Sequence, residues 1–582
     1  MYRFLLVFAR ALAAPWFLLT LLALTVSCHE EDGVTGPSLP VRPPSLAISD
    51  AAHGGKSHFY FLPPILPAPA FSGVFDAALS PEVRVCRLAG ATCDADVAAF
   101  SPSTSPTVTL DPVGEAYKVV WQTKGAGLLT AETYRIQVLV GPVLLGFADL
   151  RVVSSNKDLD GLPQDVVGLV EDKTLQIKFR IEKGFVGTIR VVPGSQDIEV
   201  HATQQYAALL FDLHGNPLPG GGPVTWTSSD LTVLTIDQNG LATGQGIGTA
   251  LVSVASEGLT PPPATARVYR RLAFASDRSD TYEVFTMWSD GSHQTQLTHN
   301  SLAARQSAWS PDGSRIAFDK VLQVTGDVVT EKGIFLMNPD GTGVQQLTSG
   351  GIDHGPVWSP DGTALAFSRC FDDICSESEL YLVNADGTGL HSVSGAAPGF
   401  DDTPRWSADG RSIAFVTSRN VGTDNTVDIY TVRPDGTGLA RRTFEGDTEH
   451  VCWAPGGDIV FQREVDLALR VARLDPSTGT VTVLASTGGL DMEPCWSPDA
   501  SRIVFTKWGN VGEFVLYLMD ANGGSLFQLT AAGMSSRDGV WSPDGKRIAY
   551  SGVNGIHSIA PDGSEDTLLT SGGDNEDYSF RP

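Results

Sequence analysis

Positive charge is scarce in this sequence. Lysine and arginine together number 40 against 66 aspartate and glutamate residues, which gives a formal net charge of −26 over 582 residues. Such a chain repels a phosphate backbone, and no basic stripe with interleaved aromatic residues occurs along it. We therefore predict that the protein binds no nucleic acid. The acidity is explained either by solubility or by the attraction of a partner.

Histidine is also infrequent, and the motifs of common hydrolases are missing. The chain has 11 histidines, none in a His-x-His or His-Glu-x-x-His motif, and it contains no Gly-x-Ser-x-Gly nucleophile turn. No peptidase domain is expected after Pro582, the last residue of the sequence. We therefore expect a protein that is not an enzyme, with no metal centre and no cofactor. A bound cation such as calcium is compatible with its acidic loops.

Long hydrophobic runs are absent after the first 26 residues. Arg3 and Arg10 precede the apolar run Ala11–Val26, which is the pattern of an export signal. The small residues that end this run before Cys28 resemble the lipobox of bacterial lipoproteins. The resemblance implies a signal peptide at 1–27 and an acylated Cys28 as the mature N-terminus. Thr25 is a departure, because the family usually has leucine at that position.

The lipobox also implies a location. A lipoprotein of this kind lies in the bacterial cell envelope, and we expect the outer membrane, with the protein facing the periplasm or the cell surface. Its contact with the membrane would be through the lipid anchor only. An uncleaved anchor helix and a plain secretory signal are the alternatives. Residues 28–45 are rich in Glu, Gly and Pro and are predicted to form a flexible tether.

Residues 46–183 show the alternation of apolar and polar residues that is typical of β-strands. Clear examples are 82–86, 134–140 and 174–181, with turn residues between such segments. These patterns predict an N-terminal β-sandwich domain over 46–183. The sequence does not indicate what this domain does.

Cysteine is rare as well. Seven cysteines occur in the chain. Because export permits disulfides, the close pairs Cys86 with Cys93 and Cys370 with Cys375 are candidate disulfides. Metal binding is the rival interpretation, but neither spacing is Cys-x-x-Cys and no histidine is adjacent in the sequence.

A second module is indicated over 184–270. Its marks are Val-Thr-Trp-Thr-Ser-Ser-Asp at 224–230, an Asn-Gly pair at 239–240 and the strand-like segment 248–254. These residues resemble the bacterial group 2 immunoglobulin-like domain. Trp226 is expected to fill the space between two sheets, and the Asn-Gly pair favours a hairpin turn. The resemblance implies a spacer module.

One motif recurs from Leu272 onward. Each tryptophan of the motif is followed by a short apolar strand such as Ile316–Phe318, and a strand apolar on both faces suits burial between neighbouring propeller blades. The copies are separated by 43–49 residues, which is the length of a four-stranded blade. Trp-Ser-Pro-Asp-Gly begins at Trp309, Trp358 and Trp541, with altered copies at Trp406, Trp453 and Trp496.

The two ends of the repeat region complement each other. The first copy begins at its second strand, Leu272–Phe274, and the chain ends in Phe580-Arg-Pro, which aligns with Trp-Ser-Pro. The C-terminal strand is therefore expected to complete the first blade and to close a ring of seven blades with no open sheet edge.

This pattern resembles the TolB-like β-propellers, with their WD40-like repeats, over 271–582. The best-known members of that family have six blades, so a seventh is a departure. The predicted fold class is all-β, with a β-sandwich domain, an Ig-like β-sandwich and then a seven-bladed β-propeller closed by the C-terminal strand.

Acidic residues precede the innermost strand of most blades. By repeat geometry they surround one mouth of the central channel, where they would attract a cation or a basic partner. A solvated acidic surface without a ligand is the simpler alternative, and Arg305, Arg405 and Arg537 neutralise part of the charge. The candidate binding residues are Asp353, His354, Asp401, Asp402, Asp447, Glu449, His450, Asp491, Glu493, Asp538 and Asp577.

These features favour a binding or scaffold protein whose propeller face engages a protein or glycan of the cell envelope or outside the cell. The alternative, implied by some relatives of this propeller shape, is a metal-dependent polysaccharide lyase or another carbohydrate-active enzyme that uses His354 and His450. Cys452 and Cys495 each directly precede a repeat tryptophan. They form either a cross-blade disulfide or two buried thiols, since a disulfide requires Cα atoms within about 7 Å.

Overall fold

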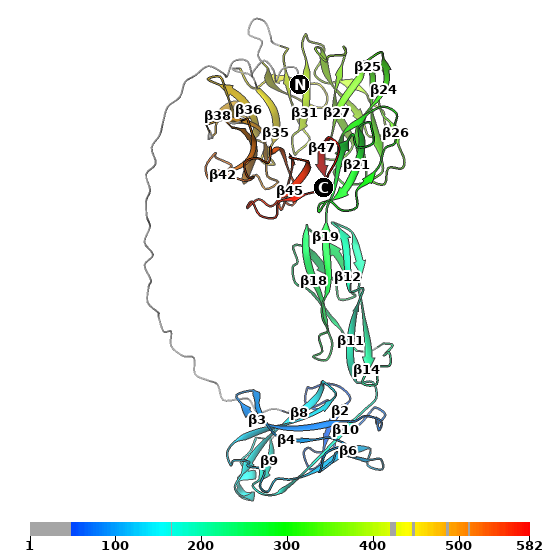
Figure 1. Ribbon diagram of the computed structural model, residues 1–582, viewed down its shortest axis with the longest axis vertical. Helices are drawn as coiled ribbons and strands as arrows, with labels where there is room; N and C mark the ends of the chain where they lie inside the picture. The colour runs from blue at the N-terminus through cyan, green and yellow to red at the C-terminus, as the bar shows by residue number, and fades with distance from the viewer. Residues whose placement is uncertain are drawn as a thin grey trace, which may run out of the picture. The chain divides into compact units, whose positions relative to one another are not determined.

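The structure of the protein is a computed structural model that describes residues 48–163, 166–220, 222–419, 427–444, 448–484, 488–509 and 512–582. The expected signal peptide 1–27, Cys28 and the tether 28–45 lie outside these residues. The described chain is built from β-strands, with the 3-10 helix η1 at Asn156–Leu159 (Figure 1). The predicted all-β class is confirmed. Within the same ranges, no helix has the length and apolar character needed to cross a membrane.

Two compact units divide the described residues. One contains Val268–Pro582 together with Gly246–Gly248, and the other contains the described residues up to Gln245 together with Thr249–Arg267.

The N-terminal part of the second unit has two sheets that share one apolar core. One sheet has the order β1-β8-β7-β3-β4, with β9 parallel to β8, and the other has the order β2-β10-β6-β5. Val85 and Ile136 of the first sheet pack in one cluster with Phe59 and Phe179 of the second. The strands are β1 (Ile48–Ser49), β2 (Phe59–Leu62), β3 (Glu82–Ala89), β4 (Thr92–Phe100), β5 (Thr109–Asp111), β6 (Ala116–Gln122), β7 (Thr133–Val140), β8 (Val143–Val153), β9 (Val167–Val170) and β10 (Thr174–Ile181).

Smaller sheets follow, with the orders β12-β19-β18-β15, β13-β17-β16 and β11-β14. Trp226 on β15 is 3% exposed. Gly240 has a φ of +82°, and a Cβ atom there would lie 2.4 Å from the carbonyl oxygen of Tyr206, so the β16–β17 turn requires glycine. The strands are β11 (Val186–Val192), β12 (Ser195–Glu199), β13 (Thr203–Gln205), β14 (Ala207–Asp212), β15 (Thr225–Ser228), β16 (Leu234–Ile236), β17 (Leu241–Gly244), β18 (Gly248–Ala255) and β19 (Ala264–Tyr269).

The propeller has seven blades of four antiparallel strands within the described residues, and we number them by chain order. Blades 2 and 3 are also joined into one sheet by a parallel bridge between Lys332 and Ile352. Blade 1 consists of β47 (Asn575–Phe580), β20 (Arg271–Ser276), β21 (Glu283–Trp288) and β22 (Thr295–Gln296). Blades 2 to 4 consist of β23 (Ala304–Trp309), β24 (Ile316–Thr325), β25 (Val328–Met337) and β26 (Gln345–Gln346); β27 (Ile352–Trp358), β28 (Ala364–Cys370), β29 (Ser378–Asn384) and β30 (His391–Ser392); and β31 (Asp401–Trp406), β32 (Ile413–Thr417), β33 (Asp428–Val432) and β34 (Ala440–Arg441).

The remaining blades have the same layout. Blades 5 to 7 consist of β35 (Thr448–Trp453), β36 (Ile459–Val465), β37 (Ala468–Asp475) and β38 (Thr480–Val483); β39 (Leu490–Trp496), β40 (Arg502–Trp508), β41 (Phe514–Asp520) and β42 (Phe527–Gln528); and β43 (Arg537–Trp541), β44 (Ile548–Gly552), β45 (Gly555–Ile559) and β46 (Thr567–Leu568).

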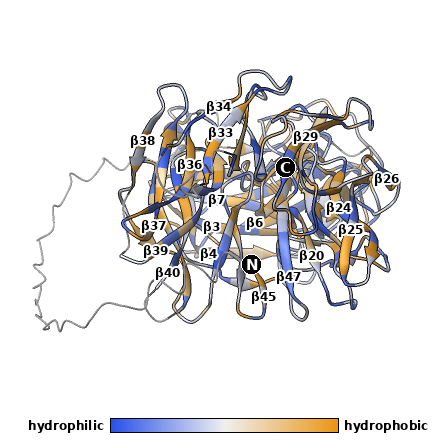
Figure 2. Ribbon diagram, turned by 90° about the horizontal axis from the view of Figure 1, so that it is seen from above, coloured by the Kyte–Doolittle hydropathy of each residue, from blue (hydrophilic) through white to orange (hydrophobic). Residues whose placement is uncertain are grey.

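Adjacent blades bury apolar side chains against each other. Ala414 and Ile429 of blade 4, for example, pack with Phe461 of blade 5. Equivalent clusters join each blade to the next, including blade 7 to blade 1. Figure 2 shows the hydrophobic colour along blade strands such as β24 and β36. Burial of both strand faces explains why the repeat follows each tryptophan with an apolar strand.

The C-terminal strand closes the ring as the repeat predicts. β47 pairs antiparallel with β20, and Phe580 stands opposite Leu272. Beyond the strand, the Arg581 amide donates a hydrogen bond of 2.7 Å to the Arg271 carbonyl. Phe580 also packs in the cluster that joins blade 1 to blade 7. The seam is therefore held both by backbone hydrogen bonds and by apolar burial.

We expect Phe580→Ala to destabilise the propeller by about 3 kcal/mol, because it removes a buried aromatic side chain from the seam. Phe580 is 6% exposed, whereas Phe444 is 67% exposed, so Phe444→Ala is the matched control and should change little. Chemical denaturation followed by tryptophan fluorescence measures both. Equal effects of the two substitutions would contradict closure through β47.

Candidate functional site

The first strands of the blades surround one axis. β23, β27, β31, β35, β39 and β43 each contact the first strand of the next blade, and β47 contacts both β43 and β23. The ring of contacts has no break at the chain ends. Side chains on the inner side of these strands therefore face the space around this axis, which we call the central channel.

The same backbone irregularity occurs in each of these strands. The residue three positions before the repeat tryptophan, or before Phe580, has a φ between +50° and +64° and lies at a shift of the strand register. Bulges of this kind re-aim side chains and are common beside binding sites. We call these residues the bulge ring: Gln306, Gly355, Thr403, His450, Glu493, Asp538 and Asp577.

Hydrogen bonds link members of the bulge ring across blades. The Gly355 amide donates to Gln306 Oε1 at 2.8 Å, and the Asp538 amide donates to Glu493 Oε2 at 3.2 Å. The Gln306 amide donates to the Asp577 carboxylate. Side chains from one blade thus satisfy amides that the bulge of the next blade exposes to the channel.

In every blade, the residue two positions before the bulge-ring residue in the sequence is buried, with an exposure of 0–7%. Three of the candidate residues lie there: Asp353, Asp401 and Asp491, with exposures of 0%, 3% and 0%. Arg369 donates to both carboxylate oxygens of Asp353, at 2.6 and 2.7 Å, and Arg419 pairs with Asp401. This differs from the expectation of a single acidic mouth, because these carboxylates are buried within the blades.

Negative charge gathers on one half of the bulge ring. Glu493, Asp538 and Asp577 come from the consecutive blades 6, 7 and 1, whereas Gln306 and Thr403 on the other half are uncharged. Partial desolvation by the surrounding protein, together with the Glu493 carboxylate, raises the pKa of Asp538 to about 7. Burial together with neighbouring carboxylates raises the pKa of Asp577 to about 6. In both cases the nearby basic groups only partly oppose the upward shift of the pKa.

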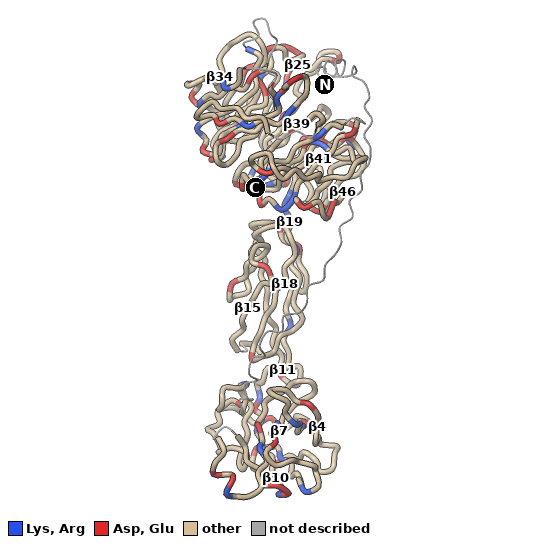
Figure 3. The backbone as a smooth tube through the Cα atoms, turned by 90° about the vertical axis from the view of Figure 1, so that its left-hand side faces the viewer, with Lys and Arg blue, Asp and Glu red and all other residues tan. Residues whose placement is uncertain are grey.

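Basic groups offset part of this charge. Arg305 pairs with Glu576 at 2.7 Å, and Arg537 approaches Asp538 at 3.6 Å. The Asp538 side chain keeps 48% exposure, so it remains open to solvent in the channel. Figure 3 shows acidic residues interspersed with basic ones over the propeller.

The other candidates have separate environments. Gln462 donates to the Glu449 carboxylate at 3.3 Å. Burial lowers the pKa of His450, which favours its neutral form. His354 and Asp402 face each other across blades 3 and 4, with 3.3 Å between Nε2 and Oδ1. Asp447 lies outside the described residues.

Asp319 is a member of this region that the sequence interpretation missed. It lies on β24, is 1% exposed and has a carboxylate oxygen, Oδ2, without a hydrogen-bond partner. Burial raises its pKa, and Lys332 at 3.8 Å opposes that shift. Its position directly after the apolar segment Ile316–Phe318 is the sequence feature that could have pointed to Asp319.

A cleft of about 620 Å³ adjoins the acidic half between blades 7 and 1. Arg537, Ser551, Asp574 and Asn575 contribute to its lining. This polar lining suits a hydrated, polar partner better than an apolar one.

The three cysteine pairs considered from the sequence all form disulfides. Disulfides link Cys86 with Cys93, Cys370 with Cys375, and Cys452 with Cys495. The last pair was left open by the sequence, and its Cα atoms lie 5.2 Å apart, within disulfide range.

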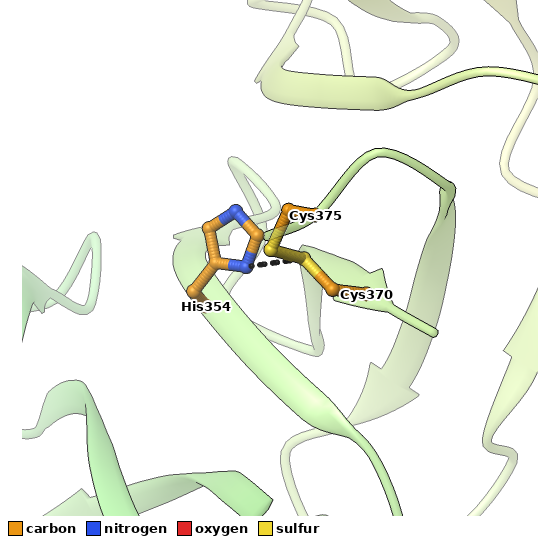
Figure 4. A group of neighbouring side chains, drawn as sticks. All are labelled: His354, Cys370 and Cys375. Carbon is orange, nitrogen blue, oxygen red and sulfur yellow. Dashed lines mark hydrogen bonds between the residues drawn. A yellow bond between two sulfur atoms is a disulfide. The ribbon is translucent and has the colours of Figure 1, made fainter. Parts of the chain in front are cut away.

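His354 lies beside the sulfurs of Cys370 and Cys375, and the ligand atoms of the three residues lie within 4.8 Å of one another (Figure 4). Because these sulfurs form a disulfide, they are not the thiolates that a metal requires.

Comparison with known proteins agrees with this architecture. Residues 350–507 match the model of the TolB beta propeller domain. A TolB homolog from Chlorobium luteolum is 31% identical over a match that covers 16% of this chain and 30% of the relative. The chain thus spans under a third of that relative's length.

Two solved structures give more distant matches. TolB from Acinetobacter baumannii is 16% identical, with 62% of this chain and 84% of that chain covered and a TM-score of 0.38. An oligogalacturonate lyase from Vibrio parahaemolyticus is 13% identical, with 50% and 86% covered and a TM-score of 0.42. By its own strand topology, the C-terminal part of the protein is a β-propeller. More particularly, it is TolB-like, since residues 350–507 match the TolB beta propeller domain.

We expect Asp538→Asn to stabilise the propeller at pH 8. The folded pKa is raised to about 7 from 3.8, so the wild-type carboxyl loses folding stability as the pH rises between these values. The substitution should raise the melting temperature by roughly 2 °C or more at pH 8 and leave it unchanged near pH 4. Calorimetry at both pH values measures this.

The control is Asp327→Asn, which changes an exposed carboxylate in the turn between β24 and β25. If the melting temperature at pH 8 rose equally in both variants, the cost of ionising a carboxyl group would not be specific to Asp538.

Proposed function

We propose that the protein is an exported, lipid-anchored binding protein whose propeller face engages a cationic protein or glycan of the cell envelope or outside the cell. The supporting observation is the acidic half of the bulge ring. Glu493, Asp538 and Asp577 converge from consecutive blades, and desolvation together with neighbouring carboxylates raises the pKa values of the two aspartates. A partner's amine or guanidinium groups would offset the repulsion between these carboxylates.

The uncharged half of the bulge ring makes the arrangement directional. Gln306 and Thr403 offer hydrogen-bonding groups but no charge, and the adjoining cleft is polar. A partner with a positive end and a polar end fits this distribution better than a uniformly basic one.

The rest of the chain has a supporting role in this proposal. The lipobox-like Cys28 would anchor the protein in the outer membrane, the tether 28–45 would follow it, and the Ig-like domain 184–270 would act as a spacer. The membrane is thus contacted through the anchor.

A metal-dependent polysaccharide lyase is the alternative, with His354 and His450 as its ligands. His354 is a poor ligand in the described state, because Nε2 faces Asp402 and Nδ1 faces the Cys370 sulfur at 3.6 Å. These contacts favour binding over lyase chemistry.

Hexalysine and chitosan hexamer are suitable amine-bearing probes of the acidic half. We expect both to bind the purified protein, and Asp538→Asn/Asp577→Asn to weaken binding at least about tenfold. Affinity for both probes should fall with added salt. For hexalysine, whose amines stay charged, it should also fall as the pH drops through about 7 to below 6, where the two aspartates become protonated. Calorimetric titration measures these effects.

The matched control is Asp340→Asn/Asp562→Asn, which removes the same charge from turns between third and fourth strands. Equal losses in both double variants would show a non-specific charge effect and would overturn the assignment to the bulge ring.

Cys28→Ser tests the anchor. We expect the variant to lose labelling by a palmitate analogue in cells and to leave the membrane fraction, since acyl chains supply the membrane affinity. Immunoblotting of fractionated cells measures the second effect, and Cys86→Ser is the control for a general thiol effect. A labelled, membrane-bound Cys28→Ser protein would contradict lipidation at this residue.

A further inference from the structure

The disulfide between Cys370 and Cys375 has a histidine against one of its sulfurs. Cys370 ends β28, and Cys375 lies in the loop before β29. His354 on β27 places Nδ1 3.6 Å from Cys370 Sγ (Figure 4). Cys370 is 2% exposed, whereas Cys375 is only partly buried. An incoming group therefore reaches the sulfur of Cys375 more readily than that of Cys370.

A carboxylate from the next blade orients this histidine. Asp402 Oδ1 lies 3.3 Å from His354 Nε2. Asp402 is itself fixed, since its Oδ1 accepts hydrogen bonds from the Thr403 amide at 2.7 Å and from Ser368 Oγ at 2.9 Å. A carboxylate at Nε2 keeps that nitrogen protonated, which leaves Nδ1 as the nitrogen that faces the sulfur.

The charges around His354 favour its protonated form. Burial opposes the imidazolium, but the hydrogen bond and charge of Asp402, with a contribution from Asp319, outweigh burial and Lys332 and raise the pKa of His354. A protonated Nδ1–H points at Cys370 Sγ, where it stabilises a developing thiolate.

The other described disulfides lack this arrangement. Cys86 Sγ contacts the carbonyl oxygen of Arg135, and Cys452 Sγ contacts the carbonyl oxygen of Trp453. A carbonyl dipole directs negative charge at the sulfur and does not stabilise a thiolate. These two disulfides therefore serve as internal comparisons for Cys370–Cys375.

We propose that Cys370–Cys375 is a reactive disulfide that exchanges with low-molecular-weight thiols, with His354 as the group that stabilises the departing Cys370 thiolate. Asp372 and Asp373 in the same loop are acidic, so a neutral or cationic thiol is preferred over an anionic one. This proposal goes beyond partner binding and does not depend on it.

The exchange balances with two thiols. A substrate thiolate attacks Cys375 Sγ, the Cys370–Cys375 bond breaks, and Cys370 leaves as a thiolate that takes the Nδ1 proton of His354. A second thiolate attacks the substrate sulfur of the mixed disulfide and releases Cys375 as a thiolate, which is protonated by water. The substrate is oxidised to its disulfide, and the protein pair is reduced to two thiols.

Timed alkylation with mass spectrometry tests this in the full chain, with cysteamine as the probe. We expect Cys370–Cys375 to open at least about tenfold faster than Cys86–Cys93, and His354→Ala to remove most of that advantage. Mercaptoacetate, an anionic thiol, should react more slowly than cysteamine at the same thiolate concentration.

The pH dependence distinguishes a role of His354 as a proton donor from a purely structural role. The rate ratio of wild type to His354→Ala should be largest at low pH, where the imidazolium is present, and should approach one as the pH rises above the pKa of His354. Asp402→Asn, a change at a positioning residue, should shift this transition to lower pH. A ratio that is the same at all pH values, or exchange no faster than at Cys86–Cys93, would overturn the proposal.

Discussion

The antiparallel pairing of β47 with β20 is the contact on which the rest of the propeller depends. It joins residues about 300 positions apart in the chain, Leu272 and Phe580 among them, so its formation closes a very long loop. The pairing removes the two sheet edges that an open row of blades would expose. It also places the first strands around one axis, without which the bulge ring would be a series of separate bulges and no channel would exist.

The position of a residue within the repeat determines its environment in this ring. The position five residues before the repeat tryptophan is buried in every described blade, while the position three residues before it adopts a positive φ and lies at the channel. A carboxylate at the first position, such as Asp353, becomes part of an internal ion pair. A carboxylate at the second, such as Asp538, retains exposure and a raised pKa. An acidic residue therefore has a structural role at the first position, whereas at the second position, two residues further along the sequence, it is a candidate binding residue.

The blades and their closure could be predicted from the sequence because the tryptophan motif and its spacing repeat, and because Phe580-Arg-Pro completes the first copy. The division of the acidic residues could not. Asp401 and Asp538 both appear as acids before an inner strand, and only the position of the bulge distinguishes them. Asp319 was missed because a single carboxylate in an apolar strand looks like ordinary variation. The Cys452–Cys495 link depends on a distance between neighbouring strands that spacing alone does not give.

Native-state hydrogen exchange of the C-terminal strand tests the central claim most directly. If β47 is a blade strand, the Ser579 amide and the others that pair with β20 exchange as slowly as the amides of β27, an inner strand from the middle of the chain. Exchange of the β47 amides at the rate of an unstructured peptide, with β27 still protected, would contradict a ring closed by the C-terminus.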